Sequence, residues 1–330
     1  MLCFSIESTA HTFATALIDS NGNILADNRD MYKKENGGII PVEAANHHNE
    51  VKDKLIEETL KILDNKKVDV VAYSRGPGLA PCLLVGLKTA KELAEKLKVP
   101  LIGVNHAVAH LTSGLLFTKS KDPVYVYVSG ANTQVITLAD KRFRVIGETL
   151  DIGLGNALDK FGRGIGLGFP AGPKIEELAK KGKYTELQYT VKGMDLVFSG
   201  IVTQAINKFN KGASKEDLCF SIQETLFSML VEVTERALAH IQKKEILLIG
   251  GVAANKRLCE MLEIMCKARG CKFYAVPLKY SGDQAVMIGW QGILEYKHKK
   301  RNDLDKADIY PYERTDDVEI NLNTLNFNMS

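Results

Sequence analysis

The sequence lacks the features that would place it in a membrane or in an oxidising compartment. No apolar run reaches the roughly 18–20 residues that a membrane-spanning helix needs. The N-terminus shows no basic region before an apolar segment, so we expect no signal peptide and a cytoplasmic location. The six cysteines are scattered without a Cys-x-x-Cys pair. That pattern favours reduced thiols over a disulfide framework or a zinc knuckle.

An excess of charge of one sign is also missing. The 330 residues carry a formal net charge of only +3, which is too small to attract a polyanion through a field spread over the whole protein. A nucleic-acid partner would therefore need local basic patches. Lysines and arginines cluster within residues 33–34, 180–183 and 297–301. Such charge runs are usually solvated surface, so they do not indicate binding by themselves.

Hydrophobic patterning predicts a unit that occurs twice. Residues 2–27 and 124–146 each predict a strand, a polar turn, a second strand, a second turn and a third strand. Helices and further strands follow each set. The repeat indicates a duplicated α/β fold with domains at 1–121 and 122–330, and a tail at about 302–322 that packs back on the first. The alternative is a coincidence between two hairpin-rich segments.

Two histidines are the strongest single indication of chemistry. His106 and His110 lie on one face of a predicted helix, with Cβ atoms roughly 5–6 Å apart. The helix follows a predicted buried strand at 100–104, where open α/β sheets place their ligand sites. The pair can hold one metal ion, or it can be two packed helix histidines. Zinc proteases with this spacing carry glutamate directly after the first histidine, whereas this chain has Ala107.

Two more segments that follow predicted strands are candidates for ligand binding. Residues 245–249 predict a strand that ends in Gly250-Gly251 and opens a helix, an arrangement that suits anions and nucleotides. Asp283 follows a Ser-Gly pair at the start of the last long helix. It can be a metal ligand, or it can simply cap that helix.

Together these motifs resemble a known family over nearly the whole chain. In order they are Glu7-Ser8-Thr9-Ala10-His11, Arg75-Gly76-Pro77-Gly78, Asn105-His106-Ala107-Val108-Ala109-His110, Ser129-Gly130-Ala131-Asn132-Thr133, Phe198-Ser199-Gly200, Gly250-Gly251-Val252-Ala253-Ala254-Asn255 and Asp283. The set resembles the tRNA threonylcarbamoyladenosine transferases, once described as glycoproteases. The histidine and Ser-Gly-x-Asn-Thr motifs resemble the archaeal and eukaryotic branch, whose members are catalytic subunits of the KEOPS complex.

The resemblance implies the duplicated actin, hexokinase and Hsp70 (ASKHA) fold, with two domains around a central cleft. It implies transfer of a threonylcarbamoyl group from threonylcarbamoyl-AMP to N6 of the adenosine 3′-adjacent to the anticodon, in tRNAs that read ANN codons. The implied partners are tRNA, a protein kinase subunit and small subunits of a KEOPS-type complex, with no membrane. The rival functions are a small-molecule kinase of the same fold, a metalloprotease, and an Hsp70-like nucleotide-binding scaffold without catalysis.

The resemblance also implies the site residues. One divalent metal, iron or zinc, would be held by His106, His110, Tyr127 and Asp283. The residues implied to bind threonylcarbamoyl-AMP, or ATP and AMP in the same site, are Tyr127, Val128, Ser129, Gly130, Ala131, Asp159, Gly172, Glu176 and Asn255. Glu7 and His11 are candidates to position the attacking amine. Without the resemblance, Tyr127 would be a core tyrosine and Glu176 an ordinary residue of an amphipathic helix.

Two positions depart from the family pattern. Ala131 stands where glycine normally follows Ser129-Gly130. A positive φ there would cost about 1 kcal/mol or more, and a close approach to phosphates would meet a methyl group. After Asp283 the chain reads Gln284-Ala285-Val286 where the family has Asn-Gly-Ala. The implied metal ligand is therefore retained among altered neighbours.

Overall fold

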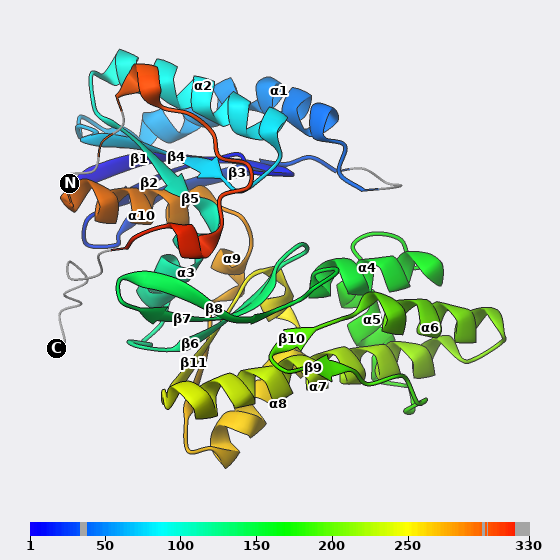
Figure 1. Cartoon of the computed structure of the whole chain (residues 1–330). Coiled ribbons are helices and arrows are strands. Elements are labelled where there is room, and N and C mark those ends of the chain that lie inside the picture. Colours follow the sequence, from blue (N-terminus) through cyan, green and yellow to red (C-terminus); the bar gives the residue numbers. More distant parts are fainter. Residues whose placement is uncertain (34–37, 299–300, 302, 321–330) are drawn as a thin grey trace. The chain divides into compact units, whose positions relative to one another are not determined.

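The computed structural model describes residues 1–33, 38–298, 301 and 303–320. The chain forms two compact units, each with its own sheet (Figure 1). Unit 1 comprises Met1–Leu116, Ala139–Phe143 and Asp283–Ser330, and unit 2 comprises Phe117–Leu138 and Arg144–Gly282. The sequence-based division assigned all of 122–330 to the second domain. The structure instead groups the described residues from Asp283 onward with the first sheet. The predicted tail residues 302, 321 and 322 lie outside the described residues.

The first sheet and its helices are built from β1 (Leu2–Glu7), β2 (Thr12–Asp19), β3 (Ile24–Met31), α1 (Pro41–Leu60), β4 (Val70–Gly76), α2 (Ala80–Leu97), β5 (Leu101–Asn105), α3 (His106–Phe117) and α10 (Ala285–Lys297). The strand order is β3-β2-β1-β4-β5. The β1–β2 and β2–β3 pairs are antiparallel, and β1–β4 and β4–β5 are parallel. Short 3₁₀ helices at Lys61–Leu63, Leu304–Lys306 and Thr315–Asp317 complete this unit.

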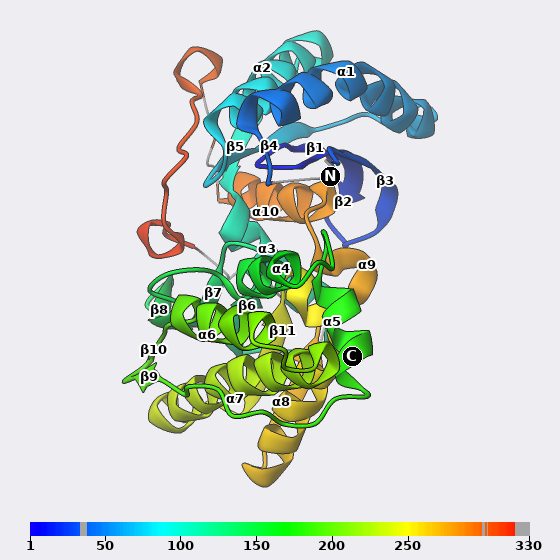
Figure 2. The same cartoon turned by 90° about the vertical axis from the view of Figure 1, so that its right-hand side faces the viewer.

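Helices cover both faces of this sheet. Helices α1 and α2 pack side by side on one face and α10 packs on the other (Figures 1 and 2). Parallel strands of this kind are buried on both faces, which explains why β1 and β5 consist of buried residues only. Helix α10 is buried from Ala285 to Glu295, as expected for a helix that is apolar on all sides.

The second sheet and its helices are built from β6 (Val124–Val128), β7 (Thr133–Ala139), β8 (Arg142–Glu148), α4 (Leu154–Gly164), α5 (Gly172–Ala179), β9 (Val191–Lys192), β10 (Asp195–Leu196), α6 (Ser199–Asn210), α7 (Lys215–Ile241), β11 (Glu245–Ile249), a 3₁₀ helix at Gly251–Ala254, α8 (Lys256–Ala268), β12 (Lys272–Ala275) and α9 (Leu278–Ser281). The strand order is β12-β11-β6-β7-β8. The β6–β7 pair is antiparallel, and β11 is parallel to both β6 and β12.

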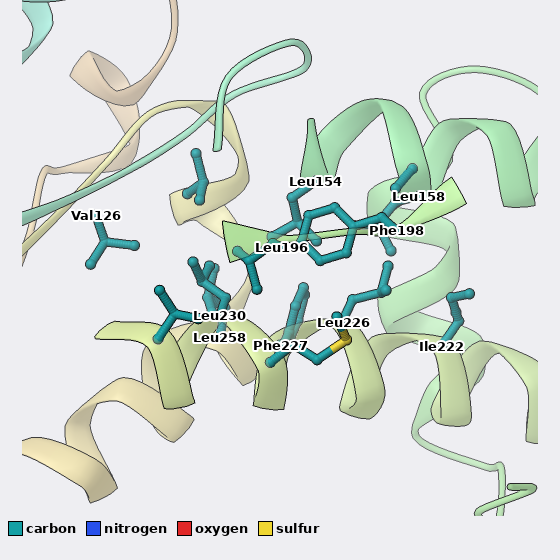
Figure 3. Close-up of a cluster of buried hydrophobic side chains, with 14 of the residues drawn as sticks. Val126, Leu154, Leu158, Leu196, Phe198, Ile222, Leu226, Phe227, Leu230 and Leu258 are labelled. Carbon is teal, nitrogen blue, oxygen red and sulfur yellow. The ribbon is translucent and has the colours of Figure 1, made fainter. Parts of the chain in front are cut away.

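The two sheets therefore share one topology. In each, a hairpin-linked trio of strands is extended by two parallel strands on the side of its first strand, and the predicted duplication is confirmed. The core of unit 2 gathers around α7, where Leu226, Phe227 and Leu230 meet Leu154 and Leu258 (Figure 3). Each fully buried side chain of this size contributes roughly 1.5–3 kcal/mol. Within the described residues, no helix has both the length and the apolar character to cross a membrane.

We predict opposite effects of one substitution at two helical glycines. A Cβ atom at Gly289 in α10 would lie 2.5 Å from Ile18 Cγ2 and 2.8 Å from Ser5 Oγ, whereas one at Gly200 in α6 would meet nothing within 4 Å. Gly289→Ala should lower the free energy of unfolding by about 1–3 kcal/mol through overpacking. Gly200→Ala should raise it by up to about 1 kcal/mol through helix propensity. Urea unfolding of both variants would test this, and equal stabilisation by both would contradict the packing argument.

Candidate functional site

The predicted histidine pair lies at the first turn of α3. Helix α3 starts where β5 ends, and the side chain of Asn105 fixes that start by accepting a hydrogen bond from Val108 N at 3.0 Å. His106 and His110 follow on one helix face, with ring centroids 4.7 Å apart and ring planes at 82°. Both residues are buried, at 8% and 2% exposure. Both imidazoles are therefore largely shielded from solvent.

Asp283 faces this pair and does not cap α10. The capping acceptor is Gln284, whose Oε1 accepts from Met287 N at 2.9 Å. Asp283 Oδ1 lies 3.3 Å from His110 Nε2 and 3.5 Å from His106 Nε2. The capping alternative for Asp283 is thus wrong, because the neighbouring glutamine takes that role and leaves the carboxylate to the histidines.

The donor set fits a divalent metal ion. One ligand atom from each of His106, His110 and Asp283 can be chosen so that all three lie within 4.8 Å of one another. Two imidazoles and one carboxylate, with coordination positions left open, suit zinc and non-haem iron. A set of this kind can act as a Lewis acid toward an oxygen of a bound substrate.

Glu7, at the end of β1, orients His106. Its carboxylate is fully buried, and Oε2 lies 2.9 Å from His106 Nδ1. Its other oxygen accepts from Thr9 N at 2.6 Å and from Thr9 Oγ1 at 2.5 Å. A carboxylate on Nδ1 fixes the ring so that Nε2 is the free ligand atom. Thr9 carries no chemical signal in the sequence except its place two residues after Glu7.

His11 is the most exposed member of this group. Its side chain is 29% exposed, and its Nδ1 lies 3.6 Å from Asp283 Oδ2 and 3.0 Å from Thr12 Oγ1. The structure therefore brings Glu7, His11, His106, His110 and Asp283 together within unit 1. Tyr127 belongs to unit 2, and its place among the metal ligands stays a prediction.

The charged groups of this cluster shift one another's pKa values. Burial lowers the pKa of His106, but Glu7 and Asp283 outweigh it and raise that pKa to about 9. Burial lowers the pKa of His110, and the neighbouring His106 lowers it further. Burial alone would raise the pKa of Asp283, but His110, His106 and His11 hold that pKa well below its usual range. In the absence of metal, His106 therefore carries the proton of the histidine pair.

In unit 2 the predicted turn follows β6. Tyr127 and Val128 are buried at the end of that strand, and the turn closes through Ser129 N donating to Asn132 O at 2.8 Å. Gly250, with φ +101°, lies so close that a Cβ atom there would be 2.2 Å from Val128 O. Gly130 lies in the same turn and is exposed, as is Ala131. Ala131 is not among the residues with positive φ, so its methyl group causes no left-handed strain.

The remaining predicted nucleotide residues gather around the starts of α5 and α8. Asp159 Oδ1 accepts from Ala171 N at 2.7 Å, directly before Gly172 begins α5. Glu176 Oε1 accepts from the first backbone N–H of α8 at 2.9 Å. Asn255 caps α8 by accepting from Leu258 N at 3.1 Å. These contacts bring the four residues into one region of unit 2, and burial raises the pKa of Asp159.

Comparison with known sequences gives one consistent result. A family model described as TsaD, tRNA N6-adenosine threonylcarbamoyltransferase, matches residues 23–290. A protein of Archaeoglobus fulgidus described as tRNA N6-adenosine threonylcarbamoyltransferase is 51% identical over 97% of this chain and 99% of its own length. A Methanocaldococcus jannaschii protein described as a probable bifunctional tRNA threonylcarbamoyladenosine biosynthesis protein is 49% identical over 97% of this chain. This chain spans 60% of the length of that bifunctional relative.

Comparison with solved structures concerns the fold alone. HypF of T. kodakarensis matches 90% of this chain and 48% of its own, with a TM-score of 0.64 and 17% identity. The (R)-2-hydroxyglutaryl-CoA dehydratase component A of Acidaminococcus fermentans matches 91% of this chain and 100% of its own, with a TM-score of 0.55 and 14% identity. The predicted actin- and Hsp70-like fold class is thereby confirmed.

We predict that the chain binds about one metal ion, because the donor set provides three protein ligands as catalytic sites do. The double variant His106→Ala, His110→Ala should lose the bound iron or zinc. His240→Ala is the matched control, because His240 is an exposed histidine at the end of α7. Elemental analysis of the three purified proteins would test this. Equal metal content in the double variant and the control would contradict it.

We also predict a pH dependence of metal affinity. With a pKa of about 9, His106 is protonated at neutral pH and must release that proton before Nε2 can bind metal. Affinity for Zn²⁺ should therefore fall by about tenfold per pH unit below pH 9, with about one proton released per ion. Glu7→Gln should flatten this slope, because it removes a charge that raises the pKa. Titration calorimetry in buffers of different ionisation enthalpy measures the number of protons released. If no proton were released at neutral pH, the conclusion that His106 is protonated without metal would be contradicted.

Proposed function

Because the chain belongs to the tRNA N6-adenosine threonylcarbamoyltransferase family, we propose that it transfers a threonylcarbamoyl group from threonylcarbamoyl-AMP to tRNA. The acceptor is N6 of the adenosine 3′-adjacent to the anticodon in tRNAs that read ANN codons. The observation that supports this most is the group formed by the buried His106 and His110 with the partly exposed Asp283. A nucleotide-binding scaffold without catalysis has no need of such a group.

An iron or zinc ion held by these residues would supply Lewis-acid chemistry, polarising the carbonyl and stabilising the phosphate leaving group. The chain's own residues prepare the site for it. Glu7 keeps a proton on His106 Nδ1 and thereby presents Nε2 toward Asp283. His11 is partly exposed beside Asp283, so it is the member of the cluster that we propose positions the attacking amine. An N6 amine is a weak nucleophile, and orientation should supply much of the rate.

We assign adenylate binding to unit 2. Asp159, Gly172, Glu176 and Asn255 are proposed to hold the adenosine, and ATP or AMP would occupy the same place. The contacts that join the starts of α5 and α8 support this, and a Cβ atom at Gly172 would meet nothing within 4 Å. The turn at 127–131 is proposed to hold the phosphate side, since its Ser129 and Asn132 form a closed polar loop.

We propose that the chain acts in a KEOPS-type complex with a protein kinase subunit and small subunits, in the cytoplasm. The name of the bifunctional relatives supports a second activity joined to this one in those proteins. The basic clusters of this chain are weak on their own: Lys180 is paired with Glu177 at 2.5 Å. Lys34, Lys299 and Lys300 lie outside the described residues. Partner subunits would therefore provide most of the contacts to tRNA phosphates.

This proposal predicts weak tRNA binding and slow transfer by the isolated chain. A few phosphate contacts give low affinity that falls steeply with salt. Addition of the kinase and small subunits should restore both tRNA binding and transfer from threonylcarbamoyl-AMP. In the complete complex Asp283→Asn should reduce transfer by about 100-fold or more, the usual cost of removing an electrostatic stabiliser.

Radiolabelled threonine in tRNA measures the transfer, and filter binding at physiological salt measures the affinity. Glu235→Gln serves as a control, because Glu235 is a carboxylate of unit 2 that pairs with Arg269, beyond the far end of α8 from the proposed adenosine site. Nanomolar tRNA binding by the chain alone would contradict the need for partners. Absence of transfer by the complete complex would contradict the proposed reaction.

A further inference from the structure

A segment near the C-terminus, residues 307–318, lies along unit 1 beside β5, drawn in orange-red in Figure 2. We call it the C-terminal segment. Ala307 and Val318 at its two ends are buried, at 5% and 4% exposure. Between them Tyr310 N donates to Arg75 O at 2.7 Å, and Gly78 N donates to Pro311 O at 3.1 Å. The segment is therefore held by backbone hydrogen bonds to the end of β4 and to the loop that follows it.

Gly76 permits this close approach. Its φ is +147°, and a Cβ atom there would lie 2.0 Å from Tyr310 O. Only a glycine fits between β4 and the C-terminal segment at that point, because any side chain would collide with a backbone carbonyl. The glycine in the Arg75-Gly76-Pro77-Gly78 motif is thus explained by the close approach of the C-terminal segment. None of the proposed catalytic roles involves this motif.

Glu313 is the centre of a polar network on this segment. Arg75 donates to both of its carboxylate oxygens, through Nε at 3.0 Å and Nη2 at 2.8 Å. Asn105 Nδ2 donates to Oε2 of the same carboxylate at 3.0 Å. The side chains of Arg75 and Glu313 are 21% and 15% exposed. A bidentate, largely buried pair with a third donor fixes geometry far better than an exposed ion pair does.

The network reaches the metal cluster through Asn105. Its side-chain amide donates to Glu313 on one side and accepts from Val108 N on the other. The carboxylate of Glu313 accepts only, and so does its backbone O at 3.4 Å from Asn105 Nδ2, so both hold the amide with its oxygen toward Val108 N. His106 is the next residue, and His110 lies one turn later on the same helix. The carboxylate of Glu313 therefore fixes the start of the helix that carries both histidines.

We propose that Glu313 is a positioning residue for the metal centre, acting through Asn105 on His106 and His110. The C-terminal segment thereby becomes part of the site, although none of its residues is a metal ligand. This inference rests on the proposed function only in that the His106, His110 and Asp283 cluster binds a metal. Removal of the carboxylate leaves Asn105 Nδ2 only the longer contact, 3.4 Å, to the backbone O of Glu313. The amide is then held less firmly, which loosens the first turn of α3.

The test measures binding of Co²⁺, which reports ligand geometry through its visible absorption spectrum. Glu313→Gln should weaken Co²⁺ binding by about tenfold, the lower end of what outer-shell partners cost, and should alter the spectrum. Arg75→Lys keeps the positive charge but loses the bidentate contact to Glu313, so it should also weaken Co²⁺ binding and alter the spectrum. The matched control is Glu224→Gln, because Glu224 forms an equally bidentate pair with Arg257 at 2.7 and 2.8 Å, with side chains 17% and 34% exposed.

A double-mutant cycle separates positioning from stability. Asn105→Ser keeps an oxygen that can cap α3 but removes the amide that donates to Glu313. In that background, Glu313→Gln should cause no further loss of Co²⁺ affinity. Wild-type affinity and spectrum in both Glu313→Gln and Arg75→Lys would overturn the proposal. So would an equal loss in Glu224→Gln. Failure of the unaltered protein to bind Co²⁺ would instead contradict the proposed metal site, and this inference with it.

Discussion

The contact between Glu7 and His106 is the interaction on which the site depends. It joins the end of β1 to the start of α3, two places that are 99 residues apart in the chain. The fold brings them together because β1, β4 and β5 are parallel neighbours whose carboxyl ends meet at one edge of the sheet. A buried carboxylate needs partners, and loss of one typically costs 3–5 kcal/mol. His106 and Thr9 supply them, so the fold and the site are stabilised by the same contact.

The same edge explains why Arg75 and Asn105 are neighbours of the site. Arg75 is the last residue but one of β4 and Asn105 is the last of β5, and both donate to Glu313 of the C-terminal segment. Three strand ends and one returning segment thus converge on the start of α3. Glu313 accepts from both Arg75 and Asn105, so the hydrogen bonds of these three side chains support one another.

Local spacing allowed the sequence to predict the histidine pair, the repeated unit of three strands and two turns, and the strand-end turns, since all three depend on residues close in the chain. It could not decide whether Asp283 caps α10 or faces the histidines. That choice depends on Gln284, whose side chain takes the cap. Nor could it assign α10 to a sheet. A helix that is apolar on all sides has no polar face from which its packing partner could be predicted. Only the structure shows that Gly289 lies close to Ser5 and Ile18, and Gly292 close to Ala72, in the first sheet.

The charge balance of the cluster gives a reason for a dipositive ion. Two carboxylates, Glu7 and Asp283, share one protonated imidazole at His106 when metal is absent, which leaves an excess negative charge in a buried place. A divalent ion that displaces that proton removes the excess, while His110 is already kept neutral by burial. The hydrogen bonds of Glu7 to Thr9 and His106 are formed beforehand. The ion therefore enters a site whose ligands need little rearrangement, and most of its binding energy is retained as affinity.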